Sequence, residues 1–477
     1  MSELKSLAKD TAIYGLSSII GKFLNYLLVP LYTYALARTA DYGIVTNIYA
    51  WTALLLVILT YGMETGFFRF ANREDYNAQN VYKTAFLTLL CSSAVFTLLV
   101  VIFHQPIANV LGYPDHAEFV EMMFATVAID AFACIPFAYL RYQKRPIVFA
   151  SLKLLFVILN IAFNILFLVI LGKNDVFYVF LSNILATTIQ TLCLLPFTLP
   201  KGGHFDAHIL REMLRYSLPL LILGVAGIMN QTLDRILFPY LYTGTDAQAQ
   251  LGIYGACFKV AMVMMMFTQA FRYAYEPFVF AKHKDRQSVE AYADAMKYYI
   301  IFSYLILLGV IFYLDIFRYI VASSYWEGLK IVPVVLWTYV FQGIYFNLSF
   351  WYKLTDETKW GAYFSLIGLV ITLVLQIIGV PRIGYWASCG SSLVCYLVIM
   401  LLSYFIGQHK APIPYDLKLI GAYTALTLGL LAVYYAIRLT TDLNMWWLMG
   451  VGTLLIGIYL FILTRKDFPL SAILHRK

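Results

Sequence analysis

The sequence predicts an all-α membrane protein with about 14 transmembrane helices. Of its 477 residues, 61% are hydrophobic and only 13% are charged. A soluble domain carries about a quarter charged residues, so this chain cannot build an ordinary water-facing surface. Apolar stretches of about 20 residues recur along the chain, and each is long enough to cross a hydrocarbon core. The aromatic content of 17% suits the headgroup belts where amphipathic rings settle.

Apolar windows separated by polar or turn-rich segments place the individual helices. The expected ranges are 11–36, 44–70, 81–103, 117–142, 148–172, 176–199, 213–243, 249–280, 297–315, 328–352, 359–380, 383–407, 416–437 and 443–464. The windows at 213–243 and 249–280 exceed a simple crossing, which predicts tilt, a kink or extension beyond the bilayer.

The distribution of positive charge predicts the orientation. When the N-terminus and every even-to-odd loop are assigned to one side, that side collects 24 of the 34 Lys and Arg residues, Lys153 among them. The positive-inside rule therefore places both termini in the cytoplasm of a multi-pass protein. A missed helix would invert half of this pattern, so the bias also supports the helix count. The net charge of +8 is then explained by contact with anionic lipid headgroups, and no nucleic-acid partner is expected.

The loops offer no catalytic apparatus. The longest outer connection, HQPIANVLGYPDHAEF, is about 16 residues long and contains no Lys or Arg. The sequence has no GxxxxGK[ST] motif for phosphate binding and no GxSxG turn. Its six cysteines lie in apolar segments without CxxC spacing, which predicts packing rather than metal ligation. These features favour a transporter over an enzyme, with no cofactor and no metal.

The chain contains an internal repeat after about 200 residues. YGLSSIIGKF at position 14 and YSLPLLILGV at position 216 each open a helix, and the short outer loops that follow end in Gly43-Ile44 and Gly252-Ile253. Two six-helix halves of the same orientation form a parallel repeat around a central cavity. We expect an N-lobe at 1–200, a C-lobe at 201–410, and helices 13 and 14 with a cytoplasmic tail at 411–477.

Ionisable side chains at membrane depth are candidate functional residues, because each costs about 2.5–3.5 kcal/mol to insert without a partner or a wet cavity. In helix 1, Lys22 and Asn25 share a polar stripe with Tyr14 and Ser18. Lys22 would hold a diphosphate as a point charge or form a salt bridge between the halves.

Helices 7 and 8 carry further polar faces. In helix 7 these are Asn230, Gln231, Asp234 and Arg235, where the adjacent Asp234 and Arg235 point about 100° apart and need not pair. In helix 8, Arg272 either faces the cavity or pairs with Glu276 four residues on.

The remaining candidates are one lysine, two carboxylates and a group of three basic residues at the end of helix 4. Lys259 either lines the cavity or extends outward to the membrane surface. Glu64 in helix 2 and Asp130 in helix 4, with Asp234 and Glu276, are candidates for coupling to a proton or a sodium ion, or else partners of buried cations. At the end of helix 4, Arg141, Lys144 and Arg145 either gather an anionic substrate or mark topology.

Four segments resemble the multidrug/oligosaccharidyl-lipid/polysaccharide exporter superfamily, within it the polysaccharide-biosynthesis branch of O-antigen-type flippases. They are YGLSSIIGKFLNYLLVPLYTYAL, ADYGIVTNIYAW, NIAFNILFLVILG with Asn160 and Asn164 one turn apart, and the basic RYQKRP. The related lipid II flippases carry several cavity arginines in their first helices, and the drug exporters have twelve helices, so this chain is less similar to both.

The resemblance implies a polyprenyl-diphosphate-linked oligosaccharide as substrate, moved from the cytoplasmic to the outer leaflet of the bacterial inner membrane by alternating access. It also implies that helices 13 and 14 border a groove for the lipid tail. The alternatives are a cation-coupled multidrug exporter on the same scaffold and, less favoured, a membrane polysaccharide polymerase or ligase.

Overall fold

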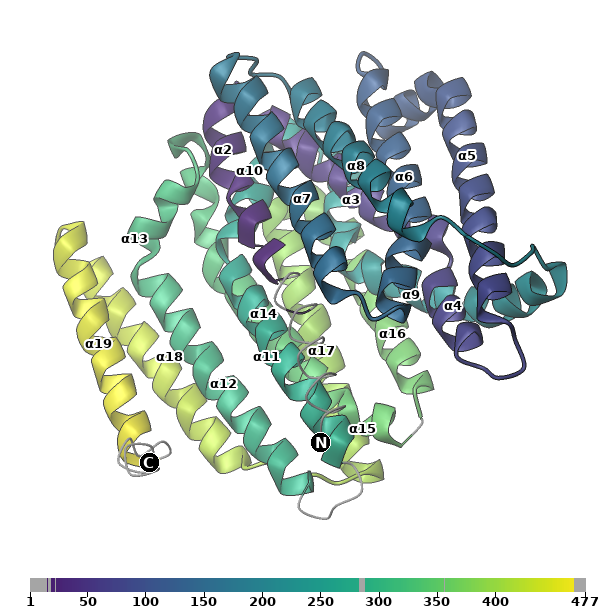
Figure 1. Ribbon diagram of the computed structural model, residues 1–477. Coiled ribbons are helices and arrows are strands. Elements are labelled where there is room, and N and C mark those ends of the chain that lie inside the picture. The colour runs from purple at the N-terminus through teal and green to yellow at the C-terminus, as the bar shows by residue number, and fades with distance from the viewer. Residues whose placement is uncertain (1–14, 16–18, 22, 283–287, 356, 467–477) are drawn as a thin grey trace. The chain divides into compact units, whose positions relative to one another are not determined.

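The computed structural model describes residues 15, 19–21, 23–282, 288–355 and 357–466, and their secondary structure is helical throughout (Figure 1). Within these ranges, 12 helical spans are long and apolar enough to cross a membrane. A thirteenth consists of two helices that meet at a bend of 46° near Ala261. The chain is therefore an all-helical membrane protein, as the sequence predicts. In the helix predicted at 11–36, residues 11–14, 16–18 and 22 lie outside the described residues.

The elements follow the predicted order. Up to Leu241 they are α2 (Leu28–Ala35), α3 (Thr39–Thr60), α4 (Met63–Ala71), α5 (Ala78–Leu111), α6 (Ala117–Tyr142), α7 (Pro146–Asn164), the π-helix η1 (Ile165–Ile170), α8 (Val176–Thr198) and α9 (Ala207–Leu241). Next come α10 (Ala247–Val260), α11 (Met262–Lys282), α12 (Ser288–Phe312), α13 (Leu314–Phe317), the 3-10 helices η2 (Arg318–Ile320) and η3 (Ser323–Ile331), and α14 (Val332–Leu348). The last five are α15 (Phe350–Leu354), α16 (Lys359–Ile383), α17 (Tyr385–Lys410), α18 (Leu417–Thr440) and α19 (Met445–Lys466).

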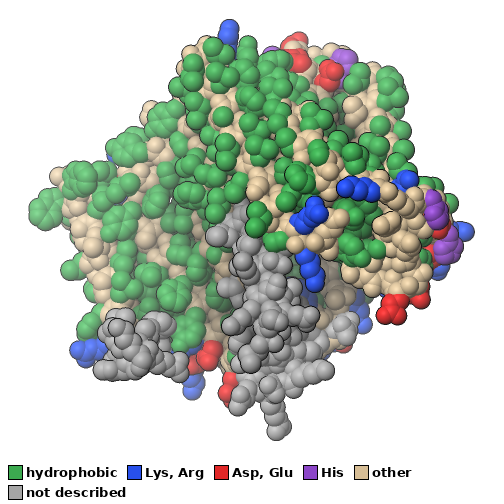
Figure 2. All heavy atoms as spheres, in the orientation of Figure 1, with side chains coloured by type: hydrophobic (Ala, Val, Ile, Leu, Met, Phe, Trp, Pro, Cys, Tyr) green, Lys and Arg blue, Asp and Glu red, His purple; other side chains and the backbone are tan. Residues whose placement is uncertain are grey.

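Apolar side chains cover the outside of these helices. Leu98, Val370 and Leu454 are each more than half exposed, and Figure 2 shows hydrophobic side chains spread over the face that it draws. Such a surface is stable only in lipid, where helices satisfy their own backbone hydrogen bonds.

The described chain forms two compact units. The first comprises residues 1–256 with 365–391, and the second comprises 257–364 with 392–477. In the first unit, α6 is the central helix and packs against α5, α8 and α3, while α9 packs along α3 and α4. Of the candidate spans in this unit, α6 is the most buried, at 67% of its apolar window.

The second unit is built around α12, which packs against α11, α14, α18 and α19. Tyr459 of α19 donates a hydrogen bond to the Ile301 carbonyl oxygen at 2.8 Å. Just beyond the end of α12, Asp315 of α13 pairs with Arg438 of α18 at 3.1 Å. The two helices that fall outside the predicted repeat therefore pack directly on α12.

The predicted long outer loop after helix 3 is wrong. α5 continues to Leu111, so only residues 112–116 separate it from α6. The helix deviates at Phe103, whose φ and ψ are −109° and 17°. This kink places Pro106 in the first turn of a new helical segment, where its missing N–H is tolerated.

The two glycines at the predicted loop ends both lie inside helices, Gly43 before the start predicted at 44 and Gly252 within the range predicted at 249–280. Gly43 belongs to the second turn of α3 and Gly252 to the second turn of α10. A Cβ at Gly43 would lie 1.8 Å from the Gln248 carbonyl oxygen, and one at Gly252 would lie 2.0 Å from the Thr39 carbonyl oxygen. These are equivalent positions of the predicted repeat, so its two copies touch backbone to backbone here.

The second predicted span is broken in its middle. Tyr61 and Gly62 adopt positive φ values of 32° and 70° between α3 and α4. The Ser217 hydroxyl of α9 donates to the Gly62 carbonyl oxygen at 3.2 Å. Glycine suits this left-handed conformation, and the break points the first turn of α4 into the interior of the first unit.

Candidate functional site

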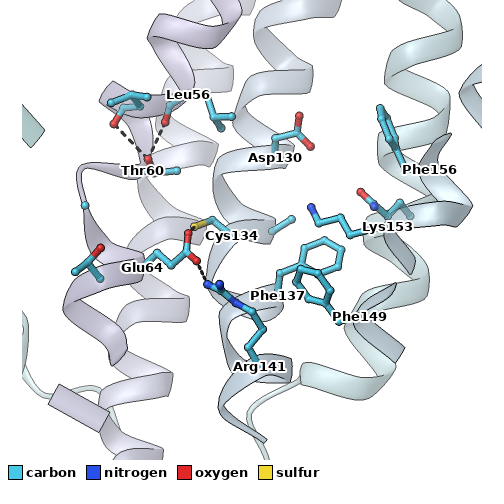
Figure 3. Close-up of a pocket in the computed structure, with 15 residues that line it drawn as sticks. Leu56, Thr60, Glu64, Asp130, Cys134, Phe137, Arg141, Phe149, Lys153 and Phe156 are labelled. Atoms are coloured by element: carbon cyan, nitrogen blue, oxygen red, sulfur yellow. Dashed lines mark hydrogen bonds and ion pairs between the residues drawn. The ribbon is translucent and has the colours of Figure 1, made fainter. Parts of the chain in front are cut away.

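A cavity of about 560 Å³ lies beside the break in the first unit. Five elements supply its walls: the end of α3, α4, α6, α7 and α8. Its polar lining consists of Thr60, Glu64, Thr65, Asp130, Cys134, Arg141, Lys153 and Gln190. Figure 3 shows these helices and the side chains that point into the space between them. A cavity of this size with convergent polar groups is a typical ligand site.

Glu64 and Arg141 form an ion pair on one side of this cavity (Figure 3). Glu64 is in the first turn of α4, immediately after the break, and Arg141 is in the last turn of α6. The Cys134 thiol donates to the other Glu64 oxygen at 3.4 Å. The Arg141 guanidinium also lies 4.9 Å from the centre of the Phe68 ring. The carboxylate side chain is 43% exposed and the guanidinium side chain 35%, so a ligand in the cavity can reach both.

Asp130 and Lys153 form the other charged side. Asp130 lies on α6 one turn before Cys134, because residues four apart share a helix face. Lys153 comes from α7, and its ammonium lies 3.8 Å from the centre of the Phe137 ring. Figure 3 shows the two side chains pointing toward each other across the cavity. The site therefore contains two carboxylates and two cations, and its formal charge is balanced.

The predicted carboxylates Glu64 and Asp130 are thus brought into one cavity. Lys22 lies outside the described residues, and Asn25 is exposed. The side chain of Glu276 also lies outside what is described. Lys259 is half-buried in the second unit, and Arg272 of that unit stacks at 4.6 Å on the Phe346 ring.

The predicted residues of α9 lie elsewhere in the first unit. Asp234 is 3% exposed and accepts a hydrogen bond from the Tyr254 hydroxyl at 2.5 Å. Arg235 approaches the same carboxylate to 3.7 Å, so these neighbours form the ion pair that the sequence left open. Their side chains bend toward each other despite the 100° between their helix positions. Asn230 donates to the Ser365 carbonyl oxygen at 2.8 Å, and Gln231 is exposed.

A buried polar network lies next to the Gly43–Gly252 contact. Asn47, which is fully buried, donates to the Arg235 carbonyl oxygen at 2.7 Å and accepts from the Tyr113 hydroxyl at 2.8 Å. The Gln248 amide donates to the same hydroxyl at 3.1 Å. These bonds join α3, α9, α10 and the 112–116 connection, so the contact between repeat copies is both close-packed and hydrogen-bonded.

The charge pattern of the sequence predicts Lys153 as a topology marker of the cytoplasmic side, and for Arg141 it allows either that role or substrate binding. Both line the cavity. One signal was available: Asp130, Cys134, Phe137 and Arg141 recur at helical spacing, and Lys153 is two turns inside its helix.

Comparison with known proteins identifies the family. Residues 7–275 match the profile described as "Polysaccharide biosynthesis protein". The chain belongs to the polysaccharide biosynthesis protein family. The matched range contains every residue that lines the cavity.

This polysaccharide biosynthesis protein has the fold of flippases and multidrug transporters. The lipid II flippase MurJ in an inward closed conformation is similar with a TM-score of 0.76 and 15% identity, over 95% of this chain and 98% of that one. An inward-facing MATE family transporter of the MOP superfamily is similar with a TM-score of 0.67 and 12% identity, over 87% and 99%. An outward-facing MATE family transporter of the same superfamily gives a TM-score of 0.58 and 14% identity, over 88% and 97%. The comparison with curated protein sequences finds no match. At these identities the structures establish the fold alone.

Proposed function

We propose that this membrane transporter flips a polyprenyl-diphosphate-linked oligosaccharide from the cytoplasmic to the outer leaflet of the bacterial cytoplasmic membrane. The proposal rests on one observation: a chain of the polysaccharide biosynthesis family has a cavity lined by two cations, Arg141 and Lys153. The similar fold of a lipid II flippase supports a lipid-linked substrate.

The chemistry of the cavity suits a diphosphate. An arginine offers a planar fork of donors that matches phosphate oxygens in bidentate fashion, and a lysine adds a point charge. Both cations already face carboxylates. An incoming diphosphate would therefore replace Glu64 as the partner of Arg141 and Asp130 as the partner of Lys153. Protonation of the displaced carboxylates would then couple substrate binding to protons, with a sodium ion as the alternative.

The expected lobes give this exchange a route across the membrane. In the proposed mechanism, an N-lobe at 1–200, which holds the cavity described above, and a C-lobe at 201–410 rock against each other. The sugar hydrogen-bonds to inward-facing Tyr, Asn and Gln side chains. The prenyl tail stays in lipid along the last two helices, 411–477. Both termini are on the cytoplasmic side.

The test is leaflet-resolved accumulation of lipid-linked oligosaccharide in cells that lack the protein. Complementation uses the wild type, Arg141→Gln, Lys153→Gln and the matched control Arg211→Gln, whose exposed side chain does not line the cavity. We expect accumulation in the cytoplasmic leaflet, relieved by the wild type and the control but not by the two cavity variants. Normal outer-leaflet glycolipid without the protein would overturn the proposal, and resistance to cationic dyes would then point to multidrug export.

A further inference from the structure

The first unit contains a second polar pocket, of about 400 Å³, far along the helices from Asp130. It lies where α6 and α8 end and α5 begins, on the side that the charge pattern predicts to be cytoplasmic. Its polar lining comprises Gln79, Tyr82, Tyr139, Gln143, Arg145 and Lys201. The described lining thus contains two cations and no carboxylate, in contrast to the balanced cavity above.

The pocket is built by a folded connection between α8 and α9. The Tyr82 hydroxyl donates to the Thr198 carbonyl oxygen, and the Lys83 ammonium donates to the Gly203 carbonyl oxygen at 3.0 Å. Further along, the Asp206 amide donates to the Thr84 hydroxyl at 3.0 Å. These bonds hold Lys201 over the first turns of α5, so its position is fixed by the fold.

Two glycines make this arrangement possible. A Cβ on Gly202 would lie 2.5 Å from the Gln79 side-chain oxygen, and Gly203 has a φ of +77° with the Gln79 backbone 2.8 Å from its Cβ position. The floor of the pocket is rigid as well, because the Tyr82 and Tyr139 rings stack at 3.8 Å with 15° between their planes.

The rim of the pocket is apolar. Phe197 and Leu199 line it and are 45% and 53% exposed, and Leu192 one to two turns earlier on α8 is 61% exposed. In a membrane these side chains face acyl chains, whereas Arg145 and Lys201 are at the level of the headgroups. A cationic pocket beside an apolar helix face matches a lipid with a phosphate headgroup better than a soluble anion.

We infer that this pocket binds the phosphate-bearing headgroup of an anionic membrane lipid, with the acyl chains along the end of α8. Arg145 and Lys201 contact the phosphate, and the Gln79 and Gln143 amides hydrogen-bond the rest of the headgroup. Binding of an acidic phospholipid here does not depend on which substrate the larger cavity transports, whereas binding of a polyprenyl diphosphate rests on the proposed function. The phosphate comes either from an acidic phospholipid of the cytoplasmic leaflet or from a polyprenyl diphosphate.

The test measures binding of dioctanoyl phosphatidylglycerol to the full-length protein in micelles, with dioctanoyl phosphatidylcholine as the zwitterionic reference. We expect Arg145→Gln and Lys201→Gln each to weaken phosphatidylglycerol binding about fivefold, and the double variant about 25-fold. Lys144→Gln removes the same charge next to Arg145 but outside the pocket, and should leave binding unchanged. An equal loss in Lys144→Gln, or full binding by the double variant, would overturn the inference.

Two further measurements complete the test. A phosphatidylglycerol with a photoreactive acyl chain should cross-link to the peptide that carries Phe197 and Leu199, which reports the site without any variant. Cross-links confined to other helices would contradict the proposed site. Competition by farnesyl diphosphate at lower concentration than by phosphatidylglycerol would identify the polyprenyl diphosphate as the source, and weaker competition would identify the phospholipid.

Discussion

Several of the charged and polar residues of the cavity come from one face of a single helix, α6. Asp130, Cys134 and Arg141 project from the same side of α6, and Glu64 reaches them because the chain breaks at Tyr61 and Gly62. An unbroken second span would place Glu64 at a different angle. The break therefore positions the carboxylate that accepts from both Arg141 and Cys134.

The first prediction concerns the Glu64–Arg141 pair. Arg141→Gln should lower transport at least about tenfold, because a charge-assisted hydrogen bond contributes about 1.5–3 kcal/mol. The pair is partly exposed, so it should contribute only about 0–1 kcal/mol to folding, and the melting temperature should change little. A flipping assay in liposomes combined with thermal unfolding separates the two effects. A large fall in melting temperature with unchanged transport would assign the pair a structural role.

The second prediction concerns Asp130 and Lys153. Lys153→Gln and Asp130→Asn should each reduce transport, and the exchange Asp130→Lys with Lys153→Asp should restore a part of it if the two charges act mainly on each other. If Lys153 acts on the substrate, the exchange should stay inactive, because the cation then projects from α6 instead of α7. The liposome assay on the three variants distinguishes these outcomes, and equal activity of all three with the wild type would remove both residues from the mechanism.

At the scale of helices, the sequence predicts well that a helix is present and predicts poorly where that helix begins and ends. The range 117–142 matches α6 at both ends, because His116 and Gln143 lie at clear polar breaks. The range 81–103 misses the last turns of α5, since Pro106 reads as a stop and the kink at Phe103 that accommodates it has no local signature. The start of α3 at Thr39 is stabilised by Asp41, whose side chain accepts from the Arg38 amide at 3.0 Å.

In the Arg38–Asp41 cap, the two charged side chains also bond to each other. The Arg38 guanidinium donates to Asp41 at 2.9 Å, and this hydrogen bond raises the pKa of Arg38 further above its usual range. An arginine is charged at physiological pH in any case, so this hydrogen bond serves to fix the geometry of the cap at the start of α3.

The third prediction tests the contact between α3 and α10. Gly43→Ala places a methyl group 1.8 Å from the Gln248 carbonyl oxygen, so the helices must separate. Overpacking of this kind costs about 1–3 kcal/mol of folding free energy. Gly227→Ala is the matched control, because no heavy atom lies within 4 Å of its Cβ position. Thermal unfolding should show a lower midpoint for Gly43→Ala than for Gly227→Ala, and equal midpoints would mean that this contact does not hold the fold.

At the scale of the whole molecule, the fourth prediction is topology. Reporter fusions after residue 412, between α17 and α18, should indicate the cytoplasm, and fusions after residue 442, between α18 and α19, should indicate the outside. The physical reason is that Lys and Arg gather at the first position and the connections on the opposite side carry few of them. The opposite assignment at both positions would invert the orientation, and the same signal at both would exclude one of the two spans.

The sequence predicts the fold better than it predicts the candidate site. Hydrophobic length identifies a membrane span without any tertiary information, and the family match and the similar structures agree with that interpretation. Glu64 and Asp130 were found because carboxylates at membrane depth are costly and therefore rare. The sequence places Lys153 at the membrane surface and does not decide the role of Arg141, because a cation near a helix end has the same sequence pattern whether it faces headgroups or a cavity.

The balanced charge of the cavity has an electrical consequence. Because Glu64 and Asp130 offset Arg141 and Lys153, the unloaded site carries no formal charge, and it returns across the membrane without electrical work. A bound diphosphate adds its own negative charge to the moving complex. The interior-negative membrane potential favours movement of that negative charge from the cytoplasmic to the outer side. The gain in free energy is about 2.3 kcal/mol for each elementary charge at 100 mV. For the substrate proposed above, voltage makes the outward step favourable and does not act on the empty return as long as Glu64 and Asp130 stay ionised. If both carboxylates take up protons when the diphosphate binds, the loaded site is neutral as well, so the voltage dependence of transport distinguishes the two modes of coupling.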